Sequence, residues 1–177
     1  MSGDKKTGEI FMFREMRRIK QKLTDAECAE ILARKTSGVL AVSGDDGYPY
    51  AVPLSYVFAD GKIYFHCAKT GHKLDALQRS DKASFCVVDS DEIVPEKYTT
   101  EFRSVIVFGR VRAIEGEPGK RAALDTLAVK YSPLEKGREA EVEGALPRVC
   151  MLVLEPEHIT GKEGLELQRK KRPVEEA

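Results

Sequence analysis

The sequence predicts a mainly β fold in which six antiparallel strands form a small closed or split barrel with helices on its outside. Short apolar runs follow one another along the chain, and most are separated by tight turns. A tight turn joins only antiparallel neighbours. Helical patterns lie before the first run, after the third and after the fifth. Together these features are typical of a small β barrel flanked by helices.

The first helix is expected over residues 24–35. Thr24 and Glu27 have the spacing of a capping box, in which each side chain bonds the backbone N–H of the other residue. Apolar residues then recur at helical spacing, which predicts one buried face. The Ser-Gly pair at 37–38 is expected to end this helix.

The six strands are expected from apolar or alternating runs between turn signals. They cover residues 39–43, 48–58, 62–67, 82–89, 102–115 and 147–160. Pro49 and Pro53 lie in the second strand, and proline cannot donate to a ladder, so they must face an edge, a bulge or a ligand. Gly109 indicates a bend or bulge in the fifth strand.

Two more helices are expected, over residues 71–79 and 117–130. Residues 90–98 are polar and predict a loop. Residues 132–144 are charged and also predict a loop, with one helical turn at most. The sequence thus divides into an N-terminal arm at 1–22, a barrel domain at 23–161 and a polar, mobile tail at 162–177.

The composition is that of one soluble globular domain. Its 177 residues are enough for a single core, and 42% are hydrophobic while 33% are charged. Lys plus Arg and Asp plus Glu both number 29, so neither nucleic acid nor an anionic membrane is an expected partner. Without a membrane-length apolar run or a signal peptide, a cytoplasmic location is expected.

A candidate anion site lies where the third strand meets the helix at 71–79. A Gly-His-Lys corner at 71–73 places His72 and Lys73 at the start of this helix. Free N–H groups and the helix dipole favour negative charge there, and both side chains would add to it. The alternative for Lys73 is a solvated lysine or a partner of Asp75 or Asp81.

The remaining reactive side chains have simpler interpretations. His66 alternates with Phe65 in the third strand, so one of the two points inward, and a packed structural histidine is an alternative to a ligand contact. The four cysteines form no CxxC pair and no disulfides are expected, and Cys67, Cys86 and Cys150 are expected to be small buried hydrophobes. The three histidines lack metal-ligand spacing, so no metal site is expected.

Five segments occur in a recognisable order and spacing: residues 14–18, 47–56, 61–68, 71–74 and 103–110. In these segments the chain resembles the FMN-binding split-barrel superfamily of pyridoxamine 5′-phosphate oxidase-like proteins, and it looks most like the nitroimidazole-resistance branch of that superfamily. The likeness extends from about residue 12 to residue 160. It implies a homodimer of split barrels that holds two FMN molecules in clefts at the subunit interface.

The resemblance also implies which positions contact the flavin. These are Pro53, Leu54, Ser55, His66, Cys67, Ala68, Lys69, His72, Lys73 and Ser104. His72 and Lys73 match the basic pair that holds the phosphate, and the end of the third strand matches the contact with phosphate or ribityl. The segment 53–55 matches the backbone that faces the isoalloxazine ring, and Ser104 matches a polar contact from the fifth strand.

The resemblance implies an FMN-dependent oxidoreductase that passes electrons from a donor such as NAD(P)H to a small nitroaromatic, nitroimidazole or quinone acceptor. The substrate-binding arginine and histidine of the oxidases are not evident after Thr160, so pyridoxamine phosphate is not an expected substrate. No catalytic residue is assigned. The alternative is a non-catalytic flavin- or haem-binding module of the same fold.

Overall fold

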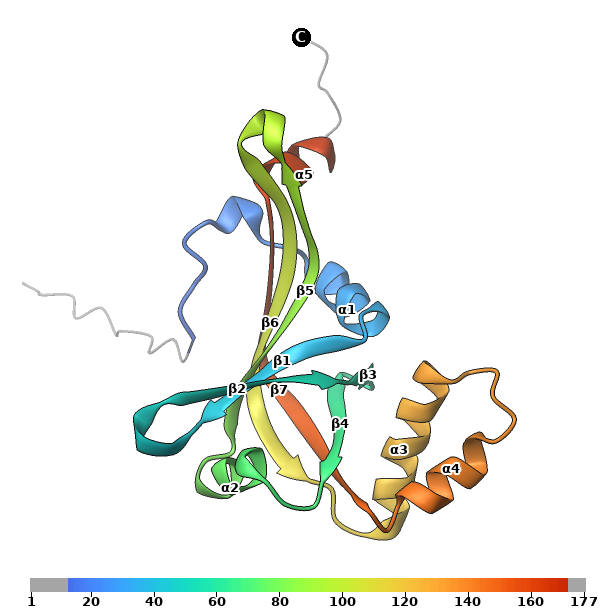
Figure 1. Ribbon diagram of the computed structural model, residues 1–177. Helices are drawn as coiled ribbons and strands as arrows, with labels where there is room; N and C mark the ends of the chain where they lie inside the picture. Colours follow the sequence, from blue (N-terminus) through green and yellow to red (C-terminus); the bar gives the residue numbers. More distant parts are fainter. Residues whose placement is uncertain (1–12, 172–177) are drawn as a thin grey trace, which may run out of the picture.

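The computed structural model describes residues 13–171, and these form one antiparallel sheet with helices around it (Figure 1). The strands are β1 (Ser37–Ser43), β2 (Pro49–Ser55), β3 (Val57–Ala59), β4 (Lys62–Ala68), β5 (Lys82–Val94), β6 (Thr99–Ala113) and β7 (Val149–Glu163). The helices are α1 (Asp25–Arg34), α2 (His72–Arg79), α3 (Glu117–Tyr131), α4 (Arg138–Ala145) and α5 (Leu165–Lys171). Short 3-10 helices occupy Ile19–Gln21, Asp45–Gly47 and Pro95–Lys97.

The mainly β class with flanking helices is confirmed, whereas the number of strands differs from the expected six. Seven strands form a sheet in the order β2-β1-β5-β6-β7-β4-β3, and the sheet is not closed. The expected strand at 48–58 breaks at Tyr56, so its halves β2 and β3 form opposite edges of the sheet. At the break, the Tyr56 N–H bonds the Thr36 carbonyl and the Tyr131 hydroxyl instead of a neighbouring strand.

The main core lies on the inner face of the curved sheet and beneath α1. Tyr56 and Phe65 both meet the ring of Phe85 edge to face, with ring centres 5.0 and 5.1 Å apart. All three side chains are fully buried, and burying one aromatic ring contributes about 1.5–3 kcal/mol. A second apolar cluster joins α3 and α4 to the sheet through Leu127, Val142 and their neighbours. This second cluster holds the two helices over β4 and β7.

The first helix follows the sequence closely at its start. The Thr24 side chain accepts a bond from the Glu27 N–H at 3.2 Å, and Glu27 accepts one from the Thr24 N–H at 2.8 Å. The Ser-Gly pair at 37–38 does not end the helix as expected, because both residues belong to β1. Gly38 is needed there for packing, since a Cβ atom at this position would lie 2.5 Å from the Phe85 ring.

Two local predictions about the sheet are confirmed. Pro49 and Pro53 lie in β2, which is an edge strand, so the missing N–H groups cost no ladder bonds on the open side. Gly109 lies at a register shift between β6 and β7, as a bulge requires. A Cβ atom at position 109 would lie only 2.2 Å from the Glu155 carbonyl oxygen.

Three segments expected to be irregular or mobile are regular in the structure. Strand β5 continues to Val94, over the first five residues of the expected loop at 90–98, and pairs there with β6 in a long two-stranded arm; Pro95–Lys97 and Tyr98 form the turn between the two strands. Helix α4 replaces most of the expected loop at 132–144. The expected tail at 162–177 contains the end of β7 and helix α5, while residues 172–177, like residues 1–12 of the arm, lie outside the described part.

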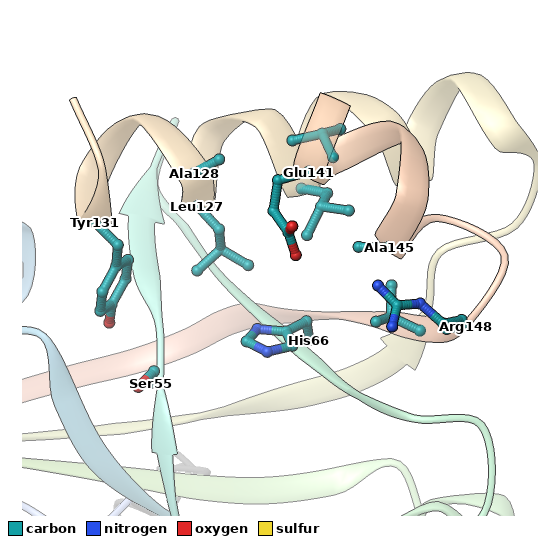
Figure 2. Close-up of a pocket in the computed structure, with 11 residues that line it drawn as sticks. Ser55, His66, Leu127, Ala128, Tyr131, Glu141, Ala145 and Arg148 are labelled. Atoms are coloured by element: carbon teal, nitrogen blue, oxygen red, sulfur yellow. The ribbon is translucent and has the colours of Figure 1, made fainter. Parts of the chain in front are cut away.

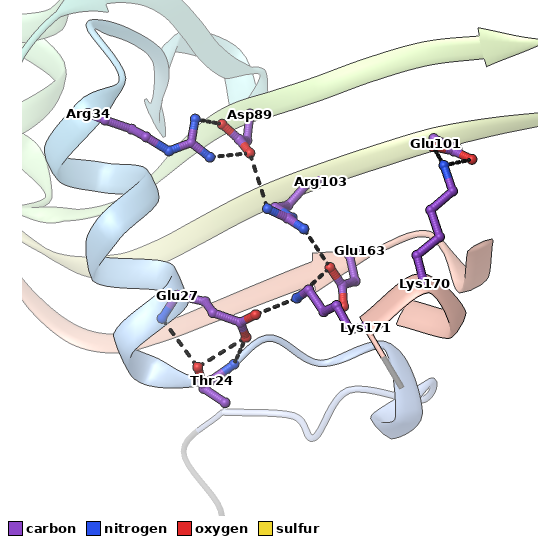
Figure 3. Close-up of polar contacts among 9 residues, drawn as sticks. All are labelled: Thr24, Glu27, Arg34, Asp89, Glu101, Arg103, Glu163, Lys170 and Lys171. Carbon is purple, nitrogen blue, oxygen red and sulfur yellow. Dashed lines mark hydrogen bonds and ion pairs between the residues drawn. The ribbon is translucent and has the colours of Figure 1, made fainter. Parts of the chain in front are cut away.

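Ion pairs tie α1 and α5 to the middle of the sheet (Figure 3). Arg34 of α1 bonds Asp89 at 2.6 Å, and Arg103 bonds Glu163 at 3.0 Å. Lys171 of α5 reaches the same Glu163 at 2.8 Å. The side chains of Asp89 and Glu163 are each only 4% exposed, and buried carboxylates of this kind require such partners. The described tail is therefore anchored to the sheet.

Candidate functional site

The corner between β4 and α2 has the geometry expected of an anion site. Helix α2 begins at His72, and Gly71 precedes it with φ at 135°, a conformation that side-chain-bearing residues rarely adopt. Among the described residues no side chain caps this end of the helix. Its first N–H groups are therefore available to an external acceptor, and the helix dipole favours an anion there.

Lys73 and His72 differ in whether their side chains already contact a carboxylate. Within residues 13–171, Lys73 has no carboxylate partner; its candidate partner Asp81 binds Arg110 at 2.8 Å. The His72 Nε2 atom lies 3.2 Å from an oxygen of Asp45, and the imidazole stacks on a tyrosine ring. Lys73 is thus the more available cation at this corner, while an anion must compete with Asp45 for His72.

Alternation along β4 decides which predicted contacts face outward. Phe65 and Cys67 point into the core, whereas His66 and Ala68 are exposed. His66 is therefore not a packed core histidine. Burial raises the pKa of the Cys67 thiol to about 11, although the nearby charge of Lys73 opposes this shift. Cys67 is consequently a protonated core residue whose backbone alone can meet a ligand.

The same alternation applies to β2. Pro53 and Ser55 are exposed, and Leu54 between them packs on the main core. The side chain of Leu54 therefore does not reach the outer surface on which Ser55 lies, and only its backbone is available there.

A pocket of about 490 Å³ brings Ser55 and His66 together beneath α3 and α4 (Figure 2). Its walls are mostly apolar. The lining residues are Ser55, His66, Leu124, Leu127, Ala128, Tyr131, Glu141, Val142, Ala145, Arg148 and Val149. Ala68, Lys69, His72 and Lys73 do not line it. The predicted contacts therefore divide between this pocket and the β4–α2 corner.

Ser104 lies elsewhere within one chain. It is in β6, opposite Val88 of β5 and Lys162 of β7, and it does not line the pocket. Its neighbours Ile106 and Phe108, two and four residues along the strand, are exposed apolar side chains on the same face. A single chain thus does not place Ser104 beside Ser55 and His66.

Three polar residues of the pocket were not predicted from the sequence. Tyr131 is the last residue of α3, Glu141 lies in α4, and Arg148 follows α4. The apolar spacing of α3 indicated a packed face, but nothing in the charged stretch at 132–144 indicated that α4 would form and cover His66.

Comparison with known proteins identifies the family. The sequence pattern of the family described as pyridoxamine 5′-phosphate oxidase matches residues 24–163, most of the chain. The chain belongs to the pyridoxamine 5′-phosphate oxidase family. The resemblance inferred from the sequence is therefore confirmed. A search of curated proteins gave no match.

Solved structures support the pyridoxamine 5′-phosphate oxidase-like fold. A proposed 5-nitroimidazole antibiotic resistance protein from Bacteroides thetaiotaomicron has 22% identity and a TM-score of 0.66, with 80% of this chain and 86% of that chain covered. An FAD and haem binding protein from Mycobacterium smegmatis has 22% identity and a TM-score of 0.68, with coverages of 82% and 74%. An FAD-binding protein from Mesorhizobium loti has 24% identity and a TM-score of 0.59, with coverages of 81% and 97%.

Among residues 13–171, no helix is long and apolar enough to cross a membrane. The same residues contain no cluster of three or more histidine, cysteine or carboxylate side chains arranged to hold a metal ion.

Proposed function

We propose that this protein binds FMN and acts as an oxidoreductase on a small organic acceptor. The observation that carries the proposal is the β4–α2 corner, where an uncapped helix start and Lys73, which has no carboxylate partner among the described residues, offer donors to a phosphate. The mostly apolar pocket that contains Ser55 and His66 gives a second surface suited to a ring system. Family membership and solved neighbours named as FAD-binding support a flavin as the ligand.

The residues present fit such a cofactor. Lys73 and the first N–H groups of α2 would hold the phosphate, with His72 contributing when it releases Asp45. The exposed side chains of Pro53 and Ser55, together with the backbone of Leu54, would border the flavin ring. A bound flavin supplies the redox chemistry, and the protein orients it and controls access. NAD(P)H is the proposed electron donor, and a nitroaromatic, nitroimidazole or quinone is the proposed acceptor.

A homodimer would complete this site. The face of the sheet that carries Ser104 also exposes apolar side chains, and they suit burial against a second copy: Val39, Val88, Ile106 and Phe108. Pairing of two chains through this face would give Ser104 a route to a flavin held by the other subunit. Light scattering on the flavin-loaded protein tests this proposal, and a monomer with full flavin occupancy would contradict it.

The direct test of the proposed function is spectroscopic. We expect the purified protein to be yellow or to become so on titration with FMN, and we expect NADH or NADPH to bleach the flavin bands without oxygen. Addition of a nitroaromatic or quinone should then restore the bands. A protein that neither contains nor binds FMN would refute the flavin role, whereas bound FMN without turnover on any reductant would refute the oxidoreductase role alone.

Haem binding is a second candidate because of His66. This exposed histidine lies in a mostly apolar pocket, which is the setting of an axial haem ligand. A structural neighbour named as an FAD and haem binding protein is consistent with it. Titration with haemin should then shift and sharpen the Soret band relative to free haemin, and His66→Ala should abolish that shift. An unshifted band with the parent protein would remove this candidate.

A further inference from the structure

Arg148 is the most distinctive polar residue of the pocket beneath α3 and α4. Its Nε–H donates to the Gly144 carbonyl at 2.9 Å, and its backbone N–H donates to the Ala145 carbonyl at 2.8 Å. Both bonds fix the residue against the end of α4. Within residues 13–171, no carboxylate pairs with its guanidinium, although the side chain lines the pocket (Figure 2). A guanidinium held this way presents its terminal N–H groups as a fork for two oxygen atoms.

The remaining surface of the pocket favours a ring. Leu124, Leu127 and Val142 form a buried apolar wall that belongs to the second core cluster. Ser55 and His66 stand on the sheet side of the cavity, and both can donate or accept hydrogen bonds. A cavity of about 490 Å³ is in the usual range for a small-molecule site.

One group in the pocket opposes an anion. Glu141 of α4 points into the cavity in Figure 2, and no described residue forms an ion pair with it. The groups with charge or titratable protons that face the cavity are thus Arg148, Glu141, His66 and Tyr131. The Nε–H bond to Gly144 orients the Arg148 guanidinium, whereas no side-chain bond within residues 13–171 orients the Glu141 carboxylate, so the preorganised group is the cation.

We propose that this pocket binds a planar aromatic carboxylate. The carboxylate lies on the guanidinium fork of Arg148, the ring packs on the wall formed by Leu127 and Val142, and Glu141 weakens the complex by repulsion. If this ligand is also the electron acceptor, that part of the inference rests on the proposed function. Binding itself requires no flavin.

The experiment compares three probes of one size on the full chain by calorimetry: 4-nitrobenzoate, 4-nitrobenzyl alcohol and 4-nitrobenzylamine. We expect the carboxylate to bind about 10-fold more tightly than the alcohol, which is the low end for hydrogen bonds to charged groups, because Arg148 is an exposed residue. Arg148→Gln should remove that preference. Glu141→Gln should increase the affinity for 4-nitrobenzoate about 2- to 5-fold, because an exposed pair of charges changes a binding constant by about that factor. Arg169→Gln, in exposed helix α5, is the matched control and should change nothing.

The opposite signs expected of Arg148→Gln and Glu141→Gln separate a direct contact from general damage to the fold. Equal binding of the three probes, preference for the amine, or an unchanged carboxylate preference in Arg148→Gln would overturn the inference. Each measurement is made without and with FMN. Selective 4-nitrobenzoate binding to flavin-free protein would support the pocket assignment even if FMN itself failed to bind.

Discussion

Removal of the Tyr131 hydroxyl should destabilise the fold at the point where the sheet is split. This hydroxyl accepts a bond from the Tyr56 N–H at 2.9 Å and lies within bonding distance of the carbonyl oxygens of Thr36 and Tyr56. In Tyr131→Phe the Tyr56 N–H keeps its 3.2 Å bond to Thr36, but the carbonyl oxygens lose this donor. Tyr131→Phe removes the bond accepted from the Tyr56 N–H and the one bond that the hydroxyl proton donates to a carbonyl. Each lost hydrogen bond costs about 0.5–1.5 kcal/mol, so we expect about 1–2 kcal/mol.

Urea denaturation followed by far-UV circular dichroism measures this change in the free energy of unfolding, and thermal denaturation gives the matching change in Tm. For a chain of this length, 1 kcal/mol corresponds to about 2–4 °C in Tm, so Tyr131→Phe should melt about 2–8 °C lower. Amide exchange at Tyr56 should also accelerate. Tyr98→Phe is the matched control because Tyr98 is 99% exposed on the β5–β6 arm, and it should stay within about 0.5 kcal/mol of the parent. An equally small effect of Tyr131→Phe would refute the role given to the hydroxyl.

Three other predictions follow from local geometry. Gly109→Ala should cost about 2–3 kcal/mol in urea denaturation, because its Cβ would meet the Glu155 carbonyl at 2.2 Å; a neutral effect would contradict the packing described. The Lys171 and Thr24 contacts lower the pKa of Glu27 from 4.5 to about 2, so its stabilising contribution is present above pH 4.5 and is lost as the pH falls toward 2. In Glu27→Gln the free energy of unfolding should therefore fall less steeply between pH 4.5 and pH 2 than in the parent. An equally steep fall in the variant would contradict this role of Glu27. Cys67, with its raised pKa, should resist iodoacetamide at pH 7.5, and mass spectrometry that finds it alkylated in the folded protein would disprove its burial.

The predictable parts of this fold are those that depend on neighbouring residues. The capping box of Thr24, the edge position of Pro49 and Pro53, and the bulge at Gly109 each follow from a local steric or hydrogen-bonding rule. The break at Tyr56 does not, because the Tyr56 N–H there donates to the hydroxyl of Tyr131, 75 residues away in the sequence. Sequence patterns carry no information on such a distant partner.

The missed elements share a second cause, which is weak burial. The end of β5 lies in an exposed two-stranded arm, and helix α4 buries only Val142, so neither has the apolar periodicity that marks an element. For the same reason, only part of the candidate site could be predicted from the sequence. Its corner at 71–73 was predictable from glycine and charge, whereas the pocket walls supplied by α4 and Arg148 were not.

The central claim is that the β4–α2 corner holds the phosphate of a flavin, and the comparison of FMN with riboflavin tests it most directly. Riboflavin has the same ring without the phosphate. A phosphate contact with Lys73 contributes about 1.5–3 kcal/mol, so the parent protein should bind FMN about 10- to 150-fold more tightly than riboflavin.

Fluorescence titrations of both ligands against the parent, Lys73→Ala and the exposed control Lys97→Ala give this ratio. We predict that Lys73→Ala weakens the binding of FMN while leaving the affinity for riboflavin unchanged. Lys97→Ala should keep the full preference for FMN over riboflavin. Equal affinities of the parent protein for FMN and riboflavin, or an unaltered preference in Lys73→Ala, would contradict the account.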